Sequence, residues 1–220
     1  MTKKILMVVS NVSEIDSEHK TGVWFEEFAV PYLGFEHNGY EILVSSLKGG
    51  VAPVDEDSYD CSSPMEWDGT KIHLDNTIRL KDVKHEDYDA IVFPGGHAPM
   101  FDIAESDYLG DIVSYFYKTG RLVAAICHGP AALINARKEN GEPLVKGLHI
   151  TSFTNTEEHI VHKDELMPFM LQSRLVSLGA KFVEEKAWSV HVETDGNLIT
   201  AQNQKSAYAF TDAIVDWFKM

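Results

Sequence analysis

The sequence AAICHGPAAL, at residues 124–133, joins an apolar run to an alanine-rich segment that begins with glycine and proline. The apolar residues 122–126 are typical of a central strand in a parallel sheet, and Gly129 and Pro130 suit a tight turn into the start of a helix. Cys127 stands at the junction. Because ligands bind outside the carboxyl ends of parallel strands, we expect Cys127 at the edge of the sheet where a site can form.

Apolar runs and segments of helical periodicity alternate along the rest of the chain. This alternation predicts an α/β fold, a flavodoxin-like three-layer sandwich with a mostly parallel sheet and helices on both faces. Asp195 and Gly196, between two alternating runs, predict a hairpin at 190–200. The other expected strands are 5–9, 40–44, 90–93, 148–151 and 181–183. The expected helices are one from 24 to Gly39, one at 100–118, an alanine-rich one after 129, one over much of 164–178, and one at 206–218.

Length and charge restrict the class of protein. The chain has 220 residues and is 44% hydrophobic, which predicts one domain over 1–220, with a long loop or small lid at about 48–78 where turn formers lack periodicity. A net charge of -15 argues against nucleic acid or an anionic membrane as a partner. No apolar run approaches the ~20 residues that span a bilayer. Two cysteines and no signal-peptide pattern predict a cytoplasmic location.

Cys127 has two interpretations. A strand-to-helix turn aims the first helical amides at the side chain, which would lower the pKa of the thiol from about 8.5 to about 3.5–7.5 and make it a nucleophile on an elbow. Alternatively, the residue is a small buried hydrophobe, as most free cysteines are. The residues that follow, His128-Gly129-Pro130, favour the interpretation of Cys127 as a nucleophile, since a core residue needs neither a glycine nor an imidazole beside it. Cys61 lies among polar residues of the 48–78 loop and receives no catalytic role.

A second strand end fits the same chemistry. Gly95 and Gly96 follow the strand at 90–93, and their amides, with that of His128, form a candidate oxyanion hole for a carbonyl oxygen beside the sulfur. A plain strand-ending turn is the alternative. The spacing of a dinucleotide fingerprint is absent, and the ten histidines contain neither H-E-x-x-H nor a Cys/His ligand pattern, so no metal is expected.

With these residues in hand, the chain resembles the ThiJ/PfpI superfamily, also called class I glutamine amidotransferase-like proteins. Within it, the sequence is most similar to the branch of heat-shock chaperones with glyoxalase III activity. The AxCHGP elbow is the most specific part of the resemblance. The matching segments are 4–9, 21–27, 49–55 with Ser58, 93–96, 124–130, 150–154 and 195–203.

The resemblance implies the roles of four site residues. Cys127 matches the nucleophile, His128 its adjacent histidine, and Glu27 the acidic residue that leans from the first helix toward the sulfur. Glu158 matches the carboxylate that orients the histidine as the third member of a triad. The alternatives for this last position are Glu157 and Asp164.

Three further features bear on that assignment. A helical glutamate is usually solvated, as Glu26 is expected to be, but burial of Glu27 at the pocket would raise its pKa and let it transfer protons near neutral pH. His97 departs from the family pattern only in the residues that follow it, Ala98-Pro99. The segment His191-Val192-Glu193 has the His-x-Glu pattern that supplies the histidine and acid of glutaminases. Its place in the strand that enters the expected hairpin indicates instead that these side chains alternate along a surface strand.

The implied function is a glyoxalase III type conversion of methylglyoxal or similar 2-oxoaldehydes into 2-hydroxy acids such as D-lactate, with action on early glycation adducts of proteins as an extension. This corresponds to a lyase- or hydrolase-type enzyme of the D-lactate dehydratase kind, and no cofactor is needed because one carbon is oxidised while its neighbour is reduced. Relatives of this kind imply a homodimer. Two alternatives share the nucleophile: a stress chaperone or cysteine oxidation sensor, and a cysteine peptidase or amidase.

Overall fold

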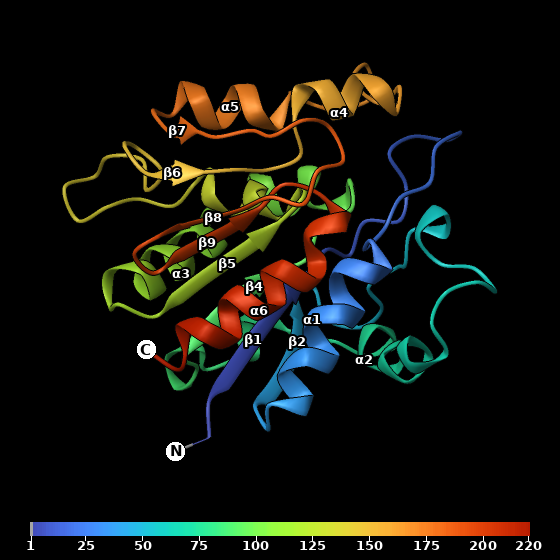
Figure 1. Cartoon of the computed structure of the whole chain (residues 1–220), viewed down its shortest axis with the longest axis horizontal. Coiled ribbons are helices and arrows are strands. Elements are labelled where there is room, and N and C mark those ends of the chain that lie inside the picture. The colour runs from blue at the N-terminus through green and yellow to red at the C-terminus, as the bar shows by residue number, and fades with distance from the viewer. Residues whose placement is uncertain (1) are drawn as a thin grey trace.

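Seven strands form the central sheet of the computed structural model, which describes residues 2–220 (Figure 1). The strand order is β3-β2-β1-β4-β5-β9-β8, and every neighbouring pair is parallel except the antiparallel β8–β9 pair. The strands are β1 Lys4–Val9, β2 Glu41–Ser46, β3 Ile78–Arg79, β4 Ala90–Phe93, β5 Leu122–Ile126, β8 Val192–Asp195 and β9 Leu198–Ala201. The predicted mostly parallel sheet is confirmed.

Helices cover both faces of the sheet because its central strands are apolar on both faces. Along β1, Ile5, Met7 and Val9 join one buried cluster, whereas Leu6 and Val8 join the other. The first cluster lies under α1 Phe25–His37 and α6 Ala207–Trp217, which pack side by side, and the second lies under α3 Asp107–Lys118 (Figure 1). The three-layer sandwich predicted from the sequence is therefore present.

The chain around 149–182 differs from the prediction. The expected strands near 148–151 and 181–183 are two-residue strands, β6 His149–Ile150 and β7 Lys181–Phe182, which pair with each other outside the central sheet. The helix expected over much of 164–178 is confined to α5 Leu171–Ser177, and an unpredicted helix, α4 Asn155–Ile160, precedes it. A capping box between Thr154 and Glu157 starts α4, and this local signal was available in the sequence.

The helices expected after the strands at 90–93 and 122–126 also differ. The helix expected over 100–118 begins only at Asp107, because the Ser106 side chain accepts a hydrogen bond from the Leu109 N–H at 3.2 Å and caps it. Two 3-10 turns, Ala98–Met100 and Ile103–Glu105, come before it. The alanine-rich helix expected after Cys127 is a five-residue 3-10 helix, Gly129–Leu133. Among residues 2–220 no helix has both the length and the apolar character to cross a membrane.

The segment at 48–78 packs against the amino-terminal end of α1. It contains 3-10 turns at Glu56–Ser58 and Met65–Thr70 and a single helical turn, α2 Ile72–Asp75. The ring of Phe25 contacts Tyr59 and Trp67 edge-on, at centroid distances of 4.8 and 6.2 Å. These contacts bring the segment to the edge of the sheet where β4 and β5 end. The remaining 3-10 turns are Leu80–Asp82, His85–Asp87 and Gln204–Ser206.

Candidate active site

Cys127 occupies a sharp turn directly after β5. Its backbone φ is +60°, a left-handed conformation that costs a non-glycine residue about 1–3 kcal/mol. Two hydrogen bonds hold it there: the Cys127 N–H donates to the Ala201 carbonyl at 2.9 Å, and the Cys127 carbonyl accepts from the Phe153 N–H at 2.9 Å. The elbow predicted from the sequence is therefore present, and its strain is balanced by bonds to segments that come later in the chain.

Two glycines let the backbone come close to this turn. A Cβ at Gly129 would lie 2.2 Å from the Phe93 carbonyl oxygen, so the turn can pass over the end of β4 only with glycine at this position. A Cβ at Gly95 would lie 2.6 Å from Glu27 Oε2 and 2.8 Å from Cys127 Cβ. Gly95 is thus in contact with both the cysteine and the glutamate, and a side chain at this position would collide with both.

Glu27 is fully buried and reaches this turn from α1. Its Oε2 accepts a hydrogen bond from the Gly95 N–H at 2.9 Å, while its Oε1 is buried without a partner among the described residues. Burial raises the pKa of Glu27 to about 8, although hydrogen bonds from the Cys127 thiol and Gly95 oppose the rise. The neighbouring Glu26 is partly exposed. The expected burial and raised pKa of Glu27 are confirmed.

The pKa of Cys127 moves in the direction opposite to our prediction. Burial raises the pKa of the thiol well above its ordinary value, and the Glu27 carboxyl adds to the rise, while the Gly96 N–H opposes it. The prediction of a thiolate of lowered pKa is therefore wrong for the resting protein. Its premise was an alanine-rich helix whose positive end faces the sulfur, but only a five-residue 3-10 helix follows. The side chain is also 5% exposed, so water does little to stabilise a thiolate.

His128 connects the sulfur to a buried carboxylate. Its Nδ1 lies 3.3 Å from Cys127 Sγ, and its Nε2 lies 2.8 Å from Glu158 Oε2. Burial opposes ionisation of Glu158, but the charges and hydrogen bonds of the two histidines beside it outweigh burial and hold the pKa of Glu158 below its ordinary range. Because the ionised Glu158 only accepts hydrogen bonds, Nε2 carries the proton and leaves Nδ1 as an acceptor for the thiol.

The second oxygen of Glu158 binds another histidine. His97 Nε2 lies 2.8 Å from Glu158 Oε1, and the His97 ring packs against the His128 ring at a centroid distance of 4.3 Å. Burial lowers the pKa of His97 to about 4, so its ring is neutral near neutral pH. The sequence prediction noted His97 only for the residues after it. Its position directly behind the Gly95-Gly96 pair at a strand end was the signal that could have placed it in the site.

The two alternatives to Glu158 have other partners. The capping glutamate, Glu157, is buried but accepts hydrogen bonds from Thr154, Trp188, Gln202 and Asn203. Asp164 pairs with the exposed His159 at 2.7 Å. Of the three carboxylates, Glu158 alone lies next to His128. His191 and Glu193 pair with each other at 3.2 Å and do not line the pocket, but their side chains are only 14% and 22% exposed, so the predicted surface position is wrong.

The amide donors differ from the expected set. The Gly95 N–H is taken up by Glu27, so Gly95 does not serve a substrate oxygen, and this part of the predicted oxyanion hole is wrong. The Gly96 N–H points at the sulfur, and the His128 N–H has no hydrogen-bond partner within residues 2–220. Two amides therefore remain as donors beside Cys127.

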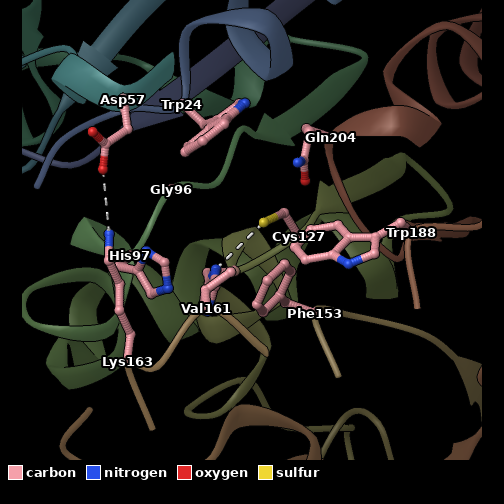
Figure 2. A pocket seen from close by; sticks show the side chains of 11 residues that line it. Trp24, Asp57, Gly96, His97, Cys127, Phe153, Val161, Lys163, Trp188 and Gln204 are labelled. Carbon is pink, nitrogen blue, oxygen red and sulfur yellow. Dashed lines mark hydrogen bonds and ion pairs between the residues drawn. The ribbon is translucent and has the colours of Figure 1, made fainter. Parts of the chain in front are cut away.

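Cys127, His128, His97 and Gly96 line a cavity of about 170 Å³, whereas Glu27 and Glu158 are not among its lining residues. Its walls include three aromatic side chains, Trp24, Phe153 and Trp188, and the Cys127 sulfur points into the space between them (Figure 2). The sequence prediction missed these three aromatic residues, which come from three separate segments. It also missed the polar lining residues Asp57, Lys163 and Gln204.

The sequence of residues 21–217 matches the DJ-1/PfpI family. The chain belongs to the DJ-1/PfpI family. Glyoxalase 3 of Candida albicans is 29% identical over 98% of this chain and 98% of its own, and the glutathione-independent glyoxalase HSP31 of Saccharomyces cerevisiae is 28% identical over 99% and 98%. The crystal structure of Candida albicans glyoxalase III has a TM-score of 0.85 at 28% identity and covers 97% of this chain and 96% of that chain. The structure of the Francisella tularensis Rapid Encystment Protein has a TM-score of 0.90 at 35% identity and covers 97% of both chains.

One cluster in this DJ-1/PfpI chain has the composition of a metal site. His97, His128 and Glu158 each offer one ligand atom, and these atoms lie within 4.8 Å of one another. Both histidine nitrogens instead hydrogen-bond to Glu158. Spacing in the sequence did not predict this cluster, because its members come from three different loops and helices.

Proposed function

We propose that this protein is a glutathione-independent glyoxalase that converts methylglyoxal or similar 2-oxoaldehydes into 2-hydroxy acids. The observation that carries the proposal is a single thiol, Cys127, that lines a small cavity, with the imidazole of His128 3.3 Å from its sulfur and the buried carboxyl of Glu27 beside it. This arrangement supplies a nucleophile and two proton-transfer groups around one substrate carbon. The glyoxalases among its relatives, which match nearly the full chain, support the same reaction.

The reaction begins when Cys127 adds to the aldehyde carbon. His128 Nδ1, 3.3 Å from the sulfur, takes the thiol proton as the new carbon–sulfur bond forms. The negative charge on the aldehyde oxygen faces the Gly96 and His128 amides, and the imidazolium then gives it the proton. The product of this step is a neutral hemithioacetal. The charge of Glu158 stabilises the transient imidazolium.

An enediol then connects the two carbons. His128 removes the hydrogen of the former aldehyde carbon as a proton, while protonated Glu27 gives its proton to the neighbouring ketone oxygen. The imidazolium next protonates the former ketone carbon, and Glu27 takes back the proton of the first hydroxyl. The first carbon is oxidised to a thioester and the second is reduced to an alcohol, so no external electron acceptor takes part.

Water completes the cycle. His128 takes a proton from a water molecule as the water oxygen bonds to the thioester carbon. The carbon–sulfur bond then breaks, the 2-hydroxy acid leaves, and the imidazolium returns the proton to the Cys127 sulfur. For methylglyoxal the product is lactate, and the family resemblance predicts the D enantiomer. The same resemblance predicts a homodimer, which the mass of the protein in solution measures directly, and a cytoplasmic location.

The other functions that use Cys127 fit the site less well. An oxidation sensor needs an accessible thiol of low pKa, whereas this thiol is 5% exposed and burial raises its pKa. A cysteine peptidase needs room for a polypeptide, whereas the cavity of about 170 Å³ is the size of a small molecule.

Turnover of methylglyoxal tests the proposal. The purified protein is incubated with methylglyoxal without glutathione, and lactate is measured with enantiomer-specific dehydrogenases. We expect lactate from the parent protein and none above background from Cys127→Ala. The matched control is Cys61→Ala, since Cys61 is exposed and free. Equal lactate from parent and Cys127→Ala would overturn the proposed function.

A further inference from the structure

Lys163 places a positive charge on one wall of the candidate active site. It follows α4, lines the cavity, and has a side chain that is only 19% exposed. Asp57, from the 48–78 segment, is the only carboxylate within 4.0 Å of its ammonium among residues 2–220, at 3.9 Å, too far for a hydrogen bond. Asp57 itself is 77% exposed, so solvent screens this pair. The ammonium has no hydrogen-bond acceptor within the described residues.

A lysine that lines a cavity and makes no hydrogen bond to a protein acceptor keeps its ammonium available to an anionic ligand, because only solvent and the screened Asp57 carboxylate compete for it. The buried carboxyl of Asp55 also feels the charge of Lys163, but no oxygen of Asp55 lies within 4.0 Å of the ammonium. The geometry therefore leaves Lys163 with unused hydrogen-bonding capacity that faces the cavity. Figure 2 shows Lys163 and Asp57 on one side of the pocket, opposite Trp188, with the Cys127 sulfur directed between them.

The size and lining of the cavity indicate a substrate larger than methylglyoxal, which has five non-hydrogen atoms. The cavity measures about 170 Å³, and an apolar protein cavity of about 150 Å³ binds benzene. Trp24, Phe153 and Trp188 offer ring faces and edges for an apolar or planar body. Such a body would extend from the carbonyl at Cys127 toward the wall that holds Lys163.

We propose that the cavity takes 2-oxoaldehydes that carry an anionic group at the end remote from the aldehyde, and that Lys163 binds this group. This inference rests on the proposed function and names its substrate class. The anion replaces Asp57 as the counterion of Lys163, and because Asp57 is exposed it can turn to solvent. The aromatic walls hold the apolar body between the anion and the dicarbonyl, which then lies at Cys127, His128 and Glu27. Lys163 acts in binding and specificity and takes no part in proton transfer.

Paired substrates that differ only in charge test the proposal. The measured quantity is the ratio of kcat/KM for 4-carboxyphenylglyoxal to that for phenylglyoxal, because this ratio cancels general losses of activity. We expect a ratio well above one in the parent protein and a fall of about ten- to a hundredfold in Lys163→Met, the range for a hydrogen bond to a charged group. Lys163→Arg keeps the charge and is expected to retain most of the ratio.

Two further variants sharpen the result. Asp57→Asn removes the competing carboxylate, so the ratio should rise severalfold. Lys118→Met removes a lysine that pairs with Glu139 at 2.9 Å on the surface of α3 and should leave the ratio unchanged. A ratio near one in the parent protein, or an equal ratio in the parent and Lys163→Met, would overturn the anion site.

A binding measurement separates this inference from the proposed function. 4-Acetylbenzoate and acetophenone lack the aldehyde, and their affinities for full-length Cys127→Ala are measured by titration calorimetry with and without Lys163→Met. If the carboxylate binds more tightly in a way that depends on Lys163, while the parent protein with Cys127 intact does not turn over methylglyoxal, the glyoxalase proposal is refuted and the anion site is supported. Turnover of methylglyoxal without any Lys163-dependent preference would do the reverse.

Discussion

Glu27 and Cys127 both contact Gly95 and are both buried, so that burial raises the pKa of each group. The Gly95 N–H donates to Glu27 Oε2 at 2.9 Å and fixes the carboxyl in place. At neutral pH both groups are protonated, and in the proposed mechanism the thiol becomes a nucleophile only when His128 removes its proton. This is a different route to reactivity from a preformed thiolate, and it makes the protonation state of Glu27 a measurable property of the enzyme.

Replacing Glu27 by Gln should reduce the rate and remove one ionisation. Loss of the acid that protonates the ketone oxygen should lower kcat/KM for methylglyoxal by about 10²- to 10⁴-fold. The pKa of about 8 means that the parent protein should lose activity as the pH rises above about 8, because Glu27 is then ionised. The pH profile of kcat/KM checks this, with Glu26→Gln as the control. A parent rate that climbs through pH 8 would contradict the assigned role.

The same ionisation should affect stability. The folded-state pKa of Glu27, about 8, lies above the value of about 4.3 for an unfolded glutamate, so its contribution to the free energy of unfolding is present below about pH 4.3 and is lost as the pH rises to about 8. Glu27→Gln has no such dependence. Its stability relative to the parent, measured by urea unfolding, should therefore increase from pH 5 to pH 9 by on the order of a few kcal/mol. A constant difference would show that Glu27 does not titrate in this range.

Alkylation of Cys127 reports the pKa of the thiol directly. Because burial and Glu27 raise this pKa, iodoacetamide should react slowly near neutral pH in a Cys61→Ala background. Glu27→Gln removes the negative charge that opposes the thiolate, so the reaction should be faster between pH 8 and pH 10. Mass spectrometry of the intact protein gives the rate. Fast alkylation of the parent at pH 6 would indicate a thiolate in the resting protein.

The adjacent glutamates of α4 should have separable effects. Glu158→Gln removes the negative charge beside His128, so kcat should fall by about 10²- to 10⁴-fold. Glu157→Gln should mainly destabilise the fold, because both oxygens of Glu157 accept hydrogen bonds and the NH2 group of glutamine can replace neither, and an unsatisfied buried group costs about 1–3 kcal/mol. Steady-state kinetics and thermal unfolding are measured for both variants. The reverse pattern would assign the triad to Glu157.

Gly129→Ala tests the backbone of the elbow. The added Cβ would lie 2.2 Å from the Phe93 carbonyl oxygen, so either the turn or the end of β4 must move. We expect a loss of about 3 kcal/mol in the free energy of unfolding, at the upper end for overpacking. Gly69→Ala is the matched control, because its Cβ would meet no atom within 4 Å. Equal stabilities in denaturant unfolding would contradict this account of the turn.

Local signals in the sequence were sufficient for part of the site. The apolar run at 122–126 and the turn formers after it placed Cys127 at the end of a central strand, and the Gly95-Gly96 pair marked the neighbouring strand end. Where local signals compete, the prediction was wrong. The alanine-rich segment after Cys127 has high helix propensity, yet it forms a 3-10 helix because it lies closely over β4.

The sequence alone determined the alternation of strands and helices and, through it, the edge at which the nucleophile lies, since both depend on residues that are neighbours in the chain. The tertiary structure decided the electrostatics of that nucleophile. Glu27 reaches Gly95 across 68 positions, Glu158 joins two histidines from other loops, and Lys163 arrives from beyond α4. A pKa or a binding preference depends on burial and on every charge nearby, and these are set only when distant segments meet.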